Sequence, residues 1–131
     1  MKTVLVVDDF ASVRFFHQSM LEQAGFSTFP AADGVEALAA LEKHPVDLIV
    51  LDLLMPGMDG IEFIQRIRGN RRFSSLPILV ITSEAENEQA QKLRETPGIG
   101  VVAKPNLPET LIREVRRLLP SQQQPVGLRV L

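Results

Sequence analysis

Short runs of apolar, mostly β-branched residues alternate along the chain with segments whose apolar residues recur at helical spacing. The alternation occurs five times and is typical of an α/β protein, in which each helix leads the chain to another parallel strand. Helices then cover both faces of the sheet. The expected strands are 4–7, 27–30, 47–51, 78–81 and 99–103.

Residues with strong helix-boundary preferences separate these strands from the helices that follow. Asp33 and Asp59 each precede a helical pattern, and we expect both to be N-caps. A polar helix is expected over about 86–95. At the start of the last helix, Asn106 followed three residues later by Glu109 resembles a capping box.

The first helix should present one apolar face to the sheet and end at Gly25. His17 lies on this helix, and we expect it at the surface or half-buried rather than as a phosphohistidine. His44, beside Pro45, should end the second helix, where a cation suits the helix dipole. The expected apolar face of the first helix consists of Val13, Phe16, Met20, Leu21 and Ala24.

The composition excludes several kinds of protein. The 131 residues suit one domain, and a net charge of −2 gives no general attraction for nucleic acid. The chain has no cysteine, and no apolar stretch approaches the roughly 18 residues of a membrane span. We expect a cytoplasmic protein without direct contact to membrane or nucleic acid. The Gln-rich, proline-bounded residues 120–131 are expected to form a flexible tail or linker stub.

Charged or hydroxyl side chains stand at the carboxyl ends of four of the five expected strands. Asp8 and Asp9 follow the first strand, Asp52 follows the third, Thr82 follows the fourth and Lys104 follows the fifth. In an open parallel sheet these strand ends form the crevice where ligands bind. We therefore expect three carboxylates, a hydroxyl and an ammonium around one point.

Three carboxylates at one point repel one another unless a cation joins them. Lys104 leaves two negative charges uncompensated, and a divalent cation would neutralise them. Hard oxygen ligands suit Mg²⁺. Asp52 is the expected nucleophile, because a carboxylate can form an aspartyl-phosphate. The metal, the lysine and the hydroxyl of Thr82 would then face the phosphoryl oxygens.

Four motifs carry a resemblance to a known family. In chain order they are VLVVDDF, LIVLDLLMPGMDG, ILVITSEA and VVAKP. In this combination the chain resembles the response-regulator receiver domains of two-component signalling, the CheY-like family. Similarity covers about residues 2–119, so a receiver domain over 1–119 is expected. The resemblance implies a doubly wound, flavodoxin-like sheet of five parallel strands in the order 2-1-3-4-5, with five helices.

The resemblance also implies roles for the strand-end residues. Asp52 would accept a phosphoryl group from a phosphohistidine on a sensor histidine kinase or phosphotransfer protein. Asp9 would bind Mg²⁺ directly, Asp8 largely through water, and the backbone carbonyl of Leu54 would be a further ligand. Such a protein promotes its own phosphorylation and turns over no separate substrate. It would signal to a downstream protein through the face formed by the fourth helix, fifth strand and fifth helix.

At the phosphoryl end, the resemblance implies that Lys104 and Thr82 contact the phosphoryl group and that a cis bond precedes Pro105. Two positions depart from the family pattern. Val101 stands where many receivers carry a Tyr or Phe that turns inward, and a valine is stiff at its first torsion. We therefore expect Thr82 and Val101 to form a muted switch. Leu54 is apolar where many receivers are polar, which predicts a longer-lived aspartyl-phosphate.

Other functions fit the residues less well. An aspartyl-phosphate phosphatase of the haloacid dehalogenase type carries D-x-D after its first strand, and Asp8-Asp9-Phe10 does not match. Neither Gly-rich nucleotide-binding pattern occurs. A pseudo-receiver that only binds partners, and an N-terminal receiver excised from a larger regulator, remain alternatives.

Two groups of arginines allow either a solvated surface or a partner site, and we favour the solvated surface. They are Arg66, Arg68, Arg71 and Arg72 in one group, and Arg113, Arg116 and Arg117 in the other.

Overall fold

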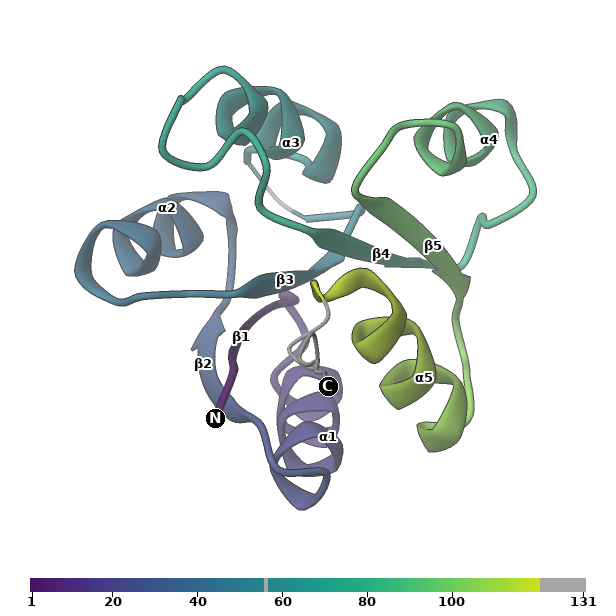
Figure 1. Ribbon diagram of the computed structural model, residues 1–131. Coiled ribbons are helices and arrows are strands. Elements are labelled where there is room, and N and C mark those ends of the chain that lie inside the picture. The colour runs from purple at the N-terminus through teal and green to yellow at the C-terminus, as the bar shows by residue number, and fades with distance from the viewer. Residues whose placement is uncertain (56, 121–131) are drawn as a thin grey trace, which may run out of the picture.

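The computed structural model describes residues 1–55 and 57–120, in which strands and helices alternate throughout (Figure 1). The predicted tail therefore lies, beyond Pro120, outside the described residues. The strands are β1 (Thr3–Val7), β2 (Ser27–Ala31), β3 (Leu48–Asp52), β4 (Ile78–Thr82) and β5 (Ile99–Ala103). The helices are α1 (Ala11–Gln23), α2 (Gly34–Lys43), α3 (Gly60–Arg68), α4 (Glu88–Arg94) and α5 (Pro108–Leu118).

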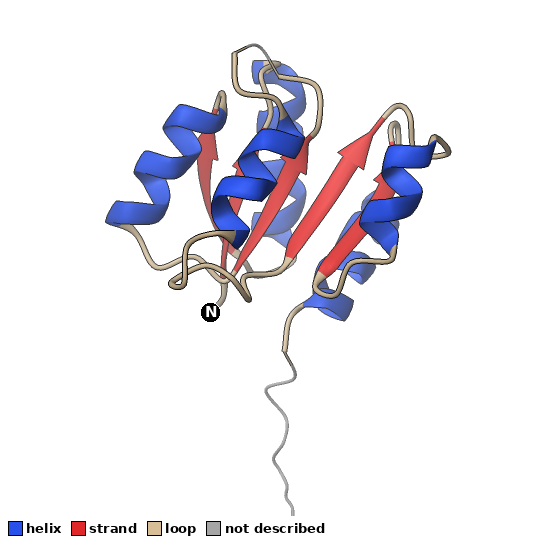
Figure 2. Ribbon diagram, turned by 90° about the horizontal axis from the view of Figure 1, so that it is seen from above, coloured by secondary structure: helices blue, strands red, loops and turns tan. Residues whose placement is uncertain are grey.

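The five strands form one parallel sheet in the order β2-β1-β3-β4-β5, which confirms the predicted fold. Helices α1 and α5 cover one face, and α2, α3 and α4 cover the other (Figure 1). All arrows in Figure 2 point the same way, so the carboxyl ends of the strands meet at one edge of the sheet.

Each face of the sheet has its own apolar core, because successive strand residues point to opposite faces. Leu5 and Ile49 belong to the core beneath α2, α3 and α4, together with the fully buried Phe63 of α3. Val4 and Leu48 belong to the core beneath α1 and α5. Strands buried on both faces tolerate no polar residue within them, so polar groups collect where the strands end.

Side-chain caps begin three helices. The carboxylates of Asp33 and Asp59 accept hydrogen bonds from the backbone N–H groups of Glu36 and Glu62, which confirms both predicted N-caps. Asn87 caps α4 in the same way, and this helix is shorter than the predicted 86–95.

The predicted capping box at the last helix is wrong. Helix α5 begins at Pro108 with Leu107 as its N-cap residue, and no side chain caps it. Proline is favoured in the first turn because it has no N–H that would need a partner. Asn106 lies before the helix, and its side-chain nitrogen donates to the carbonyl of Ala103 at 3.3 Å.

The face that α1 turns to the sheet also differs from the prediction. His17 is 4% exposed and therefore buried, not at the surface or half-buried, whereas the predicted core residue Phe16 is 50% exposed. The helix has apolar residues on both sides, so its pattern does not fix its rotation. Met20 and Leu21 are buried as expected.

Candidate functional site

The sheet register brings the expected site residues to one edge. Asp8 directly follows β1, whose last residue Val7 pairs with Leu51. Asp52 therefore lies next to the end of β1. Thr82 ends β4 opposite Ala103, and Lys104 follows immediately. A cis peptide bond joins Lys104 to Pro105, as the resemblance implied.

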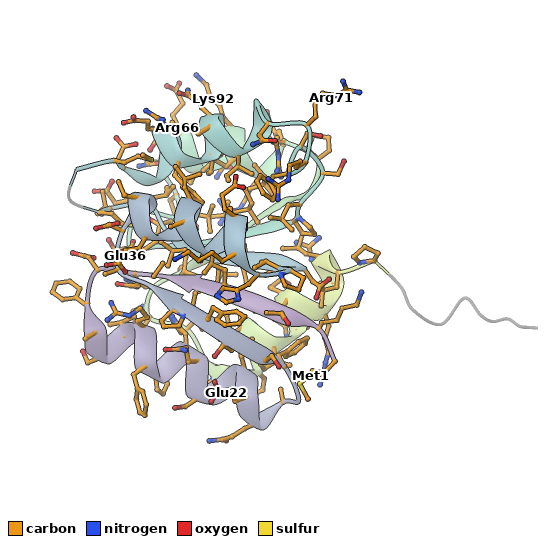
Figure 3. All side chains as sticks on the ribbon, turned by 90° about the vertical axis from the view of Figure 1, so that its left-hand side faces the viewer. Met1, Glu22, Glu36, Arg66, Arg71 and Lys92 are labelled. Carbon is orange, nitrogen blue, oxygen red and sulfur yellow. The ribbon has the colours of Figure 1, made fainter. Side chains whose placement is uncertain are left out.

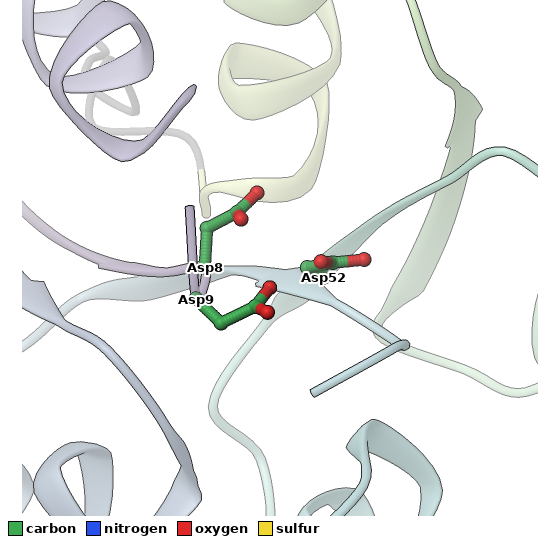
Figure 4. Close-up of side chains that lie close together, drawn as sticks. All are labelled: Asp8, Asp9 and Asp52. Carbon is green, nitrogen blue, oxygen red and sulfur yellow. The ribbon is translucent and has the colours of Figure 1, made fainter. Parts of the chain in front are cut away.

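Asp8, Asp9 and Asp52 form an acidic cluster in which one carboxylate oxygen from each residue lies within 4.8 Å of the others (Figure 4). Asp8 and Asp52 are 2% and 6% exposed, so the cluster is largely shielded from water. Charges this close and this buried interact strongly. The cluster therefore needs positive charge in order to hold all three carboxylates ionised.

Lys104 supplies one positive charge to the cluster. Its ammonium nitrogen lies 3.1 Å from Oδ2 of Asp8 and 3.5 Å from Oδ2 of Asp52. The lysine thus bridges two of the three carboxylates, and Asp9 is left without it. An oxygen of Asp9, Oδ1, is buried and has no hydrogen-bond partner.

The orphaned oxygen of Asp9 fits a bound cation. A buried carboxylate oxygen without a donor is costly, and coordination to a metal would satisfy it. Two negative charges of the cluster also remain after Lys104 is counted. An oxygen-only donor set with few protein ligands suits Mg²⁺, which keeps several of its waters. The acidic cluster is therefore compatible with Mg²⁺.

Backbone N–H groups fix the orientation of two of these carboxylates. The N–H of Phe10 donates to Oδ1 of Asp8 at 3.0 Å, and the N–H of Leu54 donates to Oδ1 of Asp52 at 3.2 Å. In each of these two carboxylates, Oδ1 thus accepts a hydrogen bond from the backbone, and Oδ2 forms an ion pair with Lys104.

Burial raises the pKa of the Asp52 carboxyl above its usual value. The hydrogen bond from Leu54 and the charge of Lys104 act in the opposite direction but do not cancel this effect, and Asp8 adds to it. A raised pKa indicates that the buried surroundings of Asp52 oppose its ionised form. Additional positive charge at the site would favour that form.

Thr82 is 1% exposed, and its hydroxyl accepts a hydrogen bond from the backbone N–H of Glu84 at 3.1 Å. Accepting this bond leaves the hydroxyl hydrogen free to point elsewhere. The carbonyl of Thr82 also accepts from the N–H of Lys104 at 2.9 Å. This backbone hydrogen bond therefore fixes the position of Lys104 relative to Thr82.

The loop after Asp52 is anchored on both sides of one exposed residue. Leu53 and Met55 are buried, whereas Leu54 is 57% exposed. Gly60 donates its N–H to the carbonyl of Leu53 at 2.8 Å, and a Cβ on Gly60 would lie 2.6 Å from the Cα of Leu53. Only glycine permits this approach of α3 to the loop. Leu54 thus stands out beside Asp52 from a fixed backbone.

Val101 lies on β5 opposite Val80 and is half-buried against the core under α4.

The carbonyl of Asp8 has a hydrogen-bond partner that the sequence did not reveal. Nη1 of Arg14 donates to it at 2.7 Å from α1. Nothing in the sequence distinguishes this arginine from surface ones, so its contact could not be predicted.

The arginine group near α3 is mostly engaged. Arg66 pairs with Glu62, Arg72 pairs with Glu42, and Arg68 donates to the carbonyl of Phe73. Arg71 makes no ion pair with the described residues and projects outward (Figure 3). These contacts favour a solvated surface with local structural roles over a partner site.

Comparison with known protein families identifies the family to which this chain belongs. A family model for the response regulator receiver domain matches residues 4–116. The chain belongs to the response-regulator receiver family. Receivers are signalling domains rather than classical enzymes. None of the helices over residues 1–55 and 57–120 combines the length and the apolar content that a membrane span requires.

Several receivers resemble this one along most of its length. It is 36% identical over 116 residues to chemotaxis protein CheY-3 of Vibrio cholerae, covering 88% of this chain and 89% of that protein. It is 34% identical over 116 residues to the chemotaxis protein CheY of Pseudomonas aeruginosa, covering 88% and 94%. The structure of Vibrio cholerae CheY4 superposes with a TM-score of 0.84 at 39% identity, covering 91% and 99%.

A receiver from another context is also similar. The signal receiver domain of a signal transduction histidine kinase from Syntrophus aciditrophicus gives a TM-score of 0.82 at 25% identity, covering 98% of both chains. The same fold thus occurs in chemotaxis proteins and in a kinase-attached receiver.

Proposed function

We propose that this receiver accepts a phosphoryl group on Asp52 from a phosphohistidine of a sensor histidine kinase or phosphotransfer protein, and passes the signal to a downstream protein. The observation that carries the proposal is the orphaned oxygen of Asp9 beside the buried Asp8–Asp52 pair. Family membership supports the same chemistry. The proposal includes a cytoplasmic location, as expected from the sequence.

Residues of this chain would hold Mg²⁺ at the acidic cluster. Asp9 and Asp52 offer carboxylate oxygens, Asp8 would act largely through water, and the backbone carbonyl of Leu54 is the further ligand implied by the family. When bound, Mg²⁺ supplies positive charge that offsets the carboxylates and the incoming phosphoryl oxygens.

Asp52 acts as the nucleophile. Its unprotonated carboxylate oxygen attacks phosphorus, the new P–O bond forms, and the P–N bond to the donor imidazole breaks. The electron pair of that bond leaves with the imidazole. Lys104, at 3.5 Å from Asp52, would pair with a phosphoryl oxygen, and the hydroxyl of Thr82 would donate its hydrogen to another.

Lys104 must share its charge between two partners in this reaction. In the unphosphorylated protein it lies nearer to Asp8 than to Asp52. A phosphoryl group on Asp52 would compete with Asp8 for the ammonium. The lysine side chain could then turn from Asp8 toward the phosphoryl oxygens.

The signal would leave through the surface of α4, β5 and α5. Thr82 and the loop that follows it would respond to the phosphoryl group, and Val101 lies on β5 two residues before Ala103, the partner of Thr82. A valine offers no rotation between two environments comparable to that of an aromatic ring. We therefore infer a muted switch at this surface.

The experiment that tests the acceptor role is phosphorylation by acetyl phosphate with and without Mg²⁺, followed by intact-mass measurement. Wild-type protein should gain one phosphoryl group only when Mg²⁺ is present. Asp52→Asn should gain none, and Asp33→Asn, which changes a helix cap instead, should behave as wild type. Equal labelling of Asp52→Asn and wild type would refute the assignment. If the wild-type protein binds no beryllofluoride in the presence of Mg²⁺, it is a pseudo-receiver that only binds partners.

A further inference from the structure

Arg14 reaches the candidate site from the first turn of α1 without joining its ion pairs. Its Nη1 donates to the backbone carbonyl of Asp8 at 2.7 Å. The ion pairs of the acidic cluster over residues 1–55 and 57–120 all involve Lys104 and none involves Arg14. An arginine next to an acidic cluster commonly forms a two-pronged ion pair with a carboxylate. Because this guanidinium binds a neutral backbone oxygen instead, the carboxylates stay open to another cation.

Asp8 is held at each of its polar groups. Its backbone N–H donates to the carbonyl of Ala31 at 3.1 Å. Its two carboxylate oxygens accept hydrogen bonds from the N–H of Phe10 and from Lys104. The bond from Arg14 to the carbonyl completes this set. Asp8 is therefore a fixed point from which the following residue, Asp9, projects.

The side chain of Asp9 has no such support. It makes no hydrogen bond or ion pair to the part of the chain that the structure describes, and its Oδ1 is buried. In Figure 4 its carboxylate nevertheless points toward Asp52. The carbonyl of Asp8 and the N–H of Asp9 belong to one planar peptide unit, so they can only rotate together. By holding that carbonyl, Arg14 holds the backbone that directs the carboxylate of Asp9.

Arg14 is itself anchored by the start of α1. Its backbone N–H donates to the carbonyl of Phe10 at 2.9 Å, and no side chain caps this helix. The guanidinium thus ties the first turn of α1 back to the residue that follows β1. The peptide unit between Asp8 and Asp9 is fixed from both sides.

We propose that Arg14 is a positioning residue for Mg²⁺: through the carbonyl of Asp8, it holds Asp9 in the orientation that directs its carboxylate into the acidic cluster. The inference rests on the proposed function, because it concerns the Mg²⁺ that phosphorylation of Asp52 would require. Arg14 acts through the backbone and not as a ligand, since a guanidinium has no lone pair to offer a metal.

The charge of Arg14 and its hydrogen bond have opposite effects on Mg²⁺ binding, so removal of the side chain separates them. A positive charge near the site repels Mg²⁺, and its loss alone would tighten binding. Loss of the hydrogen bond would let Asp9 turn away and would weaken binding. Groups that orient metal ligands are typically worth roughly 10- to 100-fold in metal affinity. We expect Arg14→Met to bind Mg²⁺ about tenfold more weakly than wild type.

Mg²⁺ titration of the unphosphorylated protein, followed by ¹H–¹⁵N amide shifts, measures this affinity without any phosphoryl chemistry. Arg14→Lys keeps the charge and one donor but not the planar fork, so its affinity should lie between those of wild type and Arg14→Met. Arg68→Met is the matched control. It also removes an arginine that donates to a backbone carbonyl, that of Phe73, but at the far end of α3 from the site. It should bind Mg²⁺ as wild type does.

Weaker binding by Arg14→Met, with unchanged binding by Arg68→Met, supports the inference. Unchanged or tighter binding by Arg14→Met overturns it and leaves the proposed function standing, as does equal weakening in Arg68→Met. A wild-type protein that binds no Mg²⁺ overturns both proposals. If the amide spectrum shows that Arg14→Met does not fold, Arg14→Lys decides in its place: weaker binding than wild type supports the inference, and equal or tighter binding overturns it.

Discussion

Lys104 donates to Oδ2 of Asp8 at 3.1 Å, a contact between residues that are 96 positions apart in the sequence. The lysine ammonium is partly accessible, whereas the side chain of Asp8 is 2% exposed. The buried carboxylate therefore depends on this lysine for compensation while no other cation is bound. The pair links β1 to β5 across the edge at which all the site residues meet.

Replacement of Lys104 should destabilise the protein most when Mg²⁺ is absent. Lys104→Met leaves Asp8 and Asp52 without their cation, and we expect a loss of about 1–3 kcal/mol in unfolding free energy in EDTA, the usual cost of a buried acceptor that loses its donor. Saturating Mg²⁺ should recover part of this loss, because the metal replaces the missing charge. Urea unfolding measures both quantities. Lys92→Met, in an exposed part of α4, is the control and should differ little from wild type in either buffer.

Asp52→Asn should stabilise the metal-free protein at neutral pH. The pKa of Asp52 is raised in the folded state, so the fold binds its proton more tightly than the unfolded chain does. Ionisation of Asp52 therefore lowers the free energy of unfolding, and this effect is complete above the folded-state pKa. The effect disappears as the pH falls below the unfolded pKa value of 3.8.

In EDTA, the unfolding free energy of Asp52→Asn, measured by urea titration, should exceed that of wild type at pH 7, and the two values should converge near pH 4. Mg²⁺ should reverse the order, since ten times its dissociation constant adds about 1.4 kcal/mol to a protein that binds it. A variant that is less stable than wild type in EDTA at pH 7 would contradict the raised pKa.

Leu54 should prolong the life of the aspartyl-phosphate. Its exposed side chain stands next to the acceptor on a backbone held by buried neighbours, and an apolar group there hinders an attacking water. We expect Leu54→Asn to hydrolyse several-fold faster, as followed by phosphate release after removal of the donor. Val35→Asn, an exposed apolar residue on α2, is the control. An unchanged half-life in Leu54→Asn would disprove the shielding role.

Val101 should show only small amide shift changes when the protein is phosphorylated or bound to beryllofluoride. Thr82 and its following loop should shift more, because in the proposed mechanism they contact the phosphoryl group directly. Two-dimensional ¹H–¹⁵N spectra of the two forms provide the comparison. Large shifts at Val101 and its β5 neighbours would show that the surface switches fully without an aromatic residue.

The sequence predicted the strands and two N-caps because these depend on local chemistry. Asp33 and Asp59 precede helices whose first N–H groups need acceptors, and both bind the N–H three residues on. The site followed from topology, since parallel strands must bring Asp8, Asp52 and Lys104 to the same edge.

The predictions from sequence were wrong where tertiary packing decides between two local structures that the sequence pattern allows equally. Asn106 and Glu109 satisfied a capping pattern, but Pro108 fits the first turn without a cap, so the helix begins later. His17 is buried because α1 turns Met20 and Leu21 to the sheet and leaves Phe16 half-exposed. Contacts such as that of Arg14 with the carbonyl of Asp8 depend on three-dimensional placement alone.

The acceptor assignment can be tested at the level of the single residue. Borohydride reduces an aspartyl-phosphate to homoserine, and peptide mass spectrometry then locates the change. After treatment with acetyl phosphate and Mg²⁺, homoserine should appear at position 52 and at neither Asp8 nor Asp9. Homoserine at another aspartate, or none at all in protein shown by intact mass to be phosphorylated, would contradict Asp52 as the acceptor.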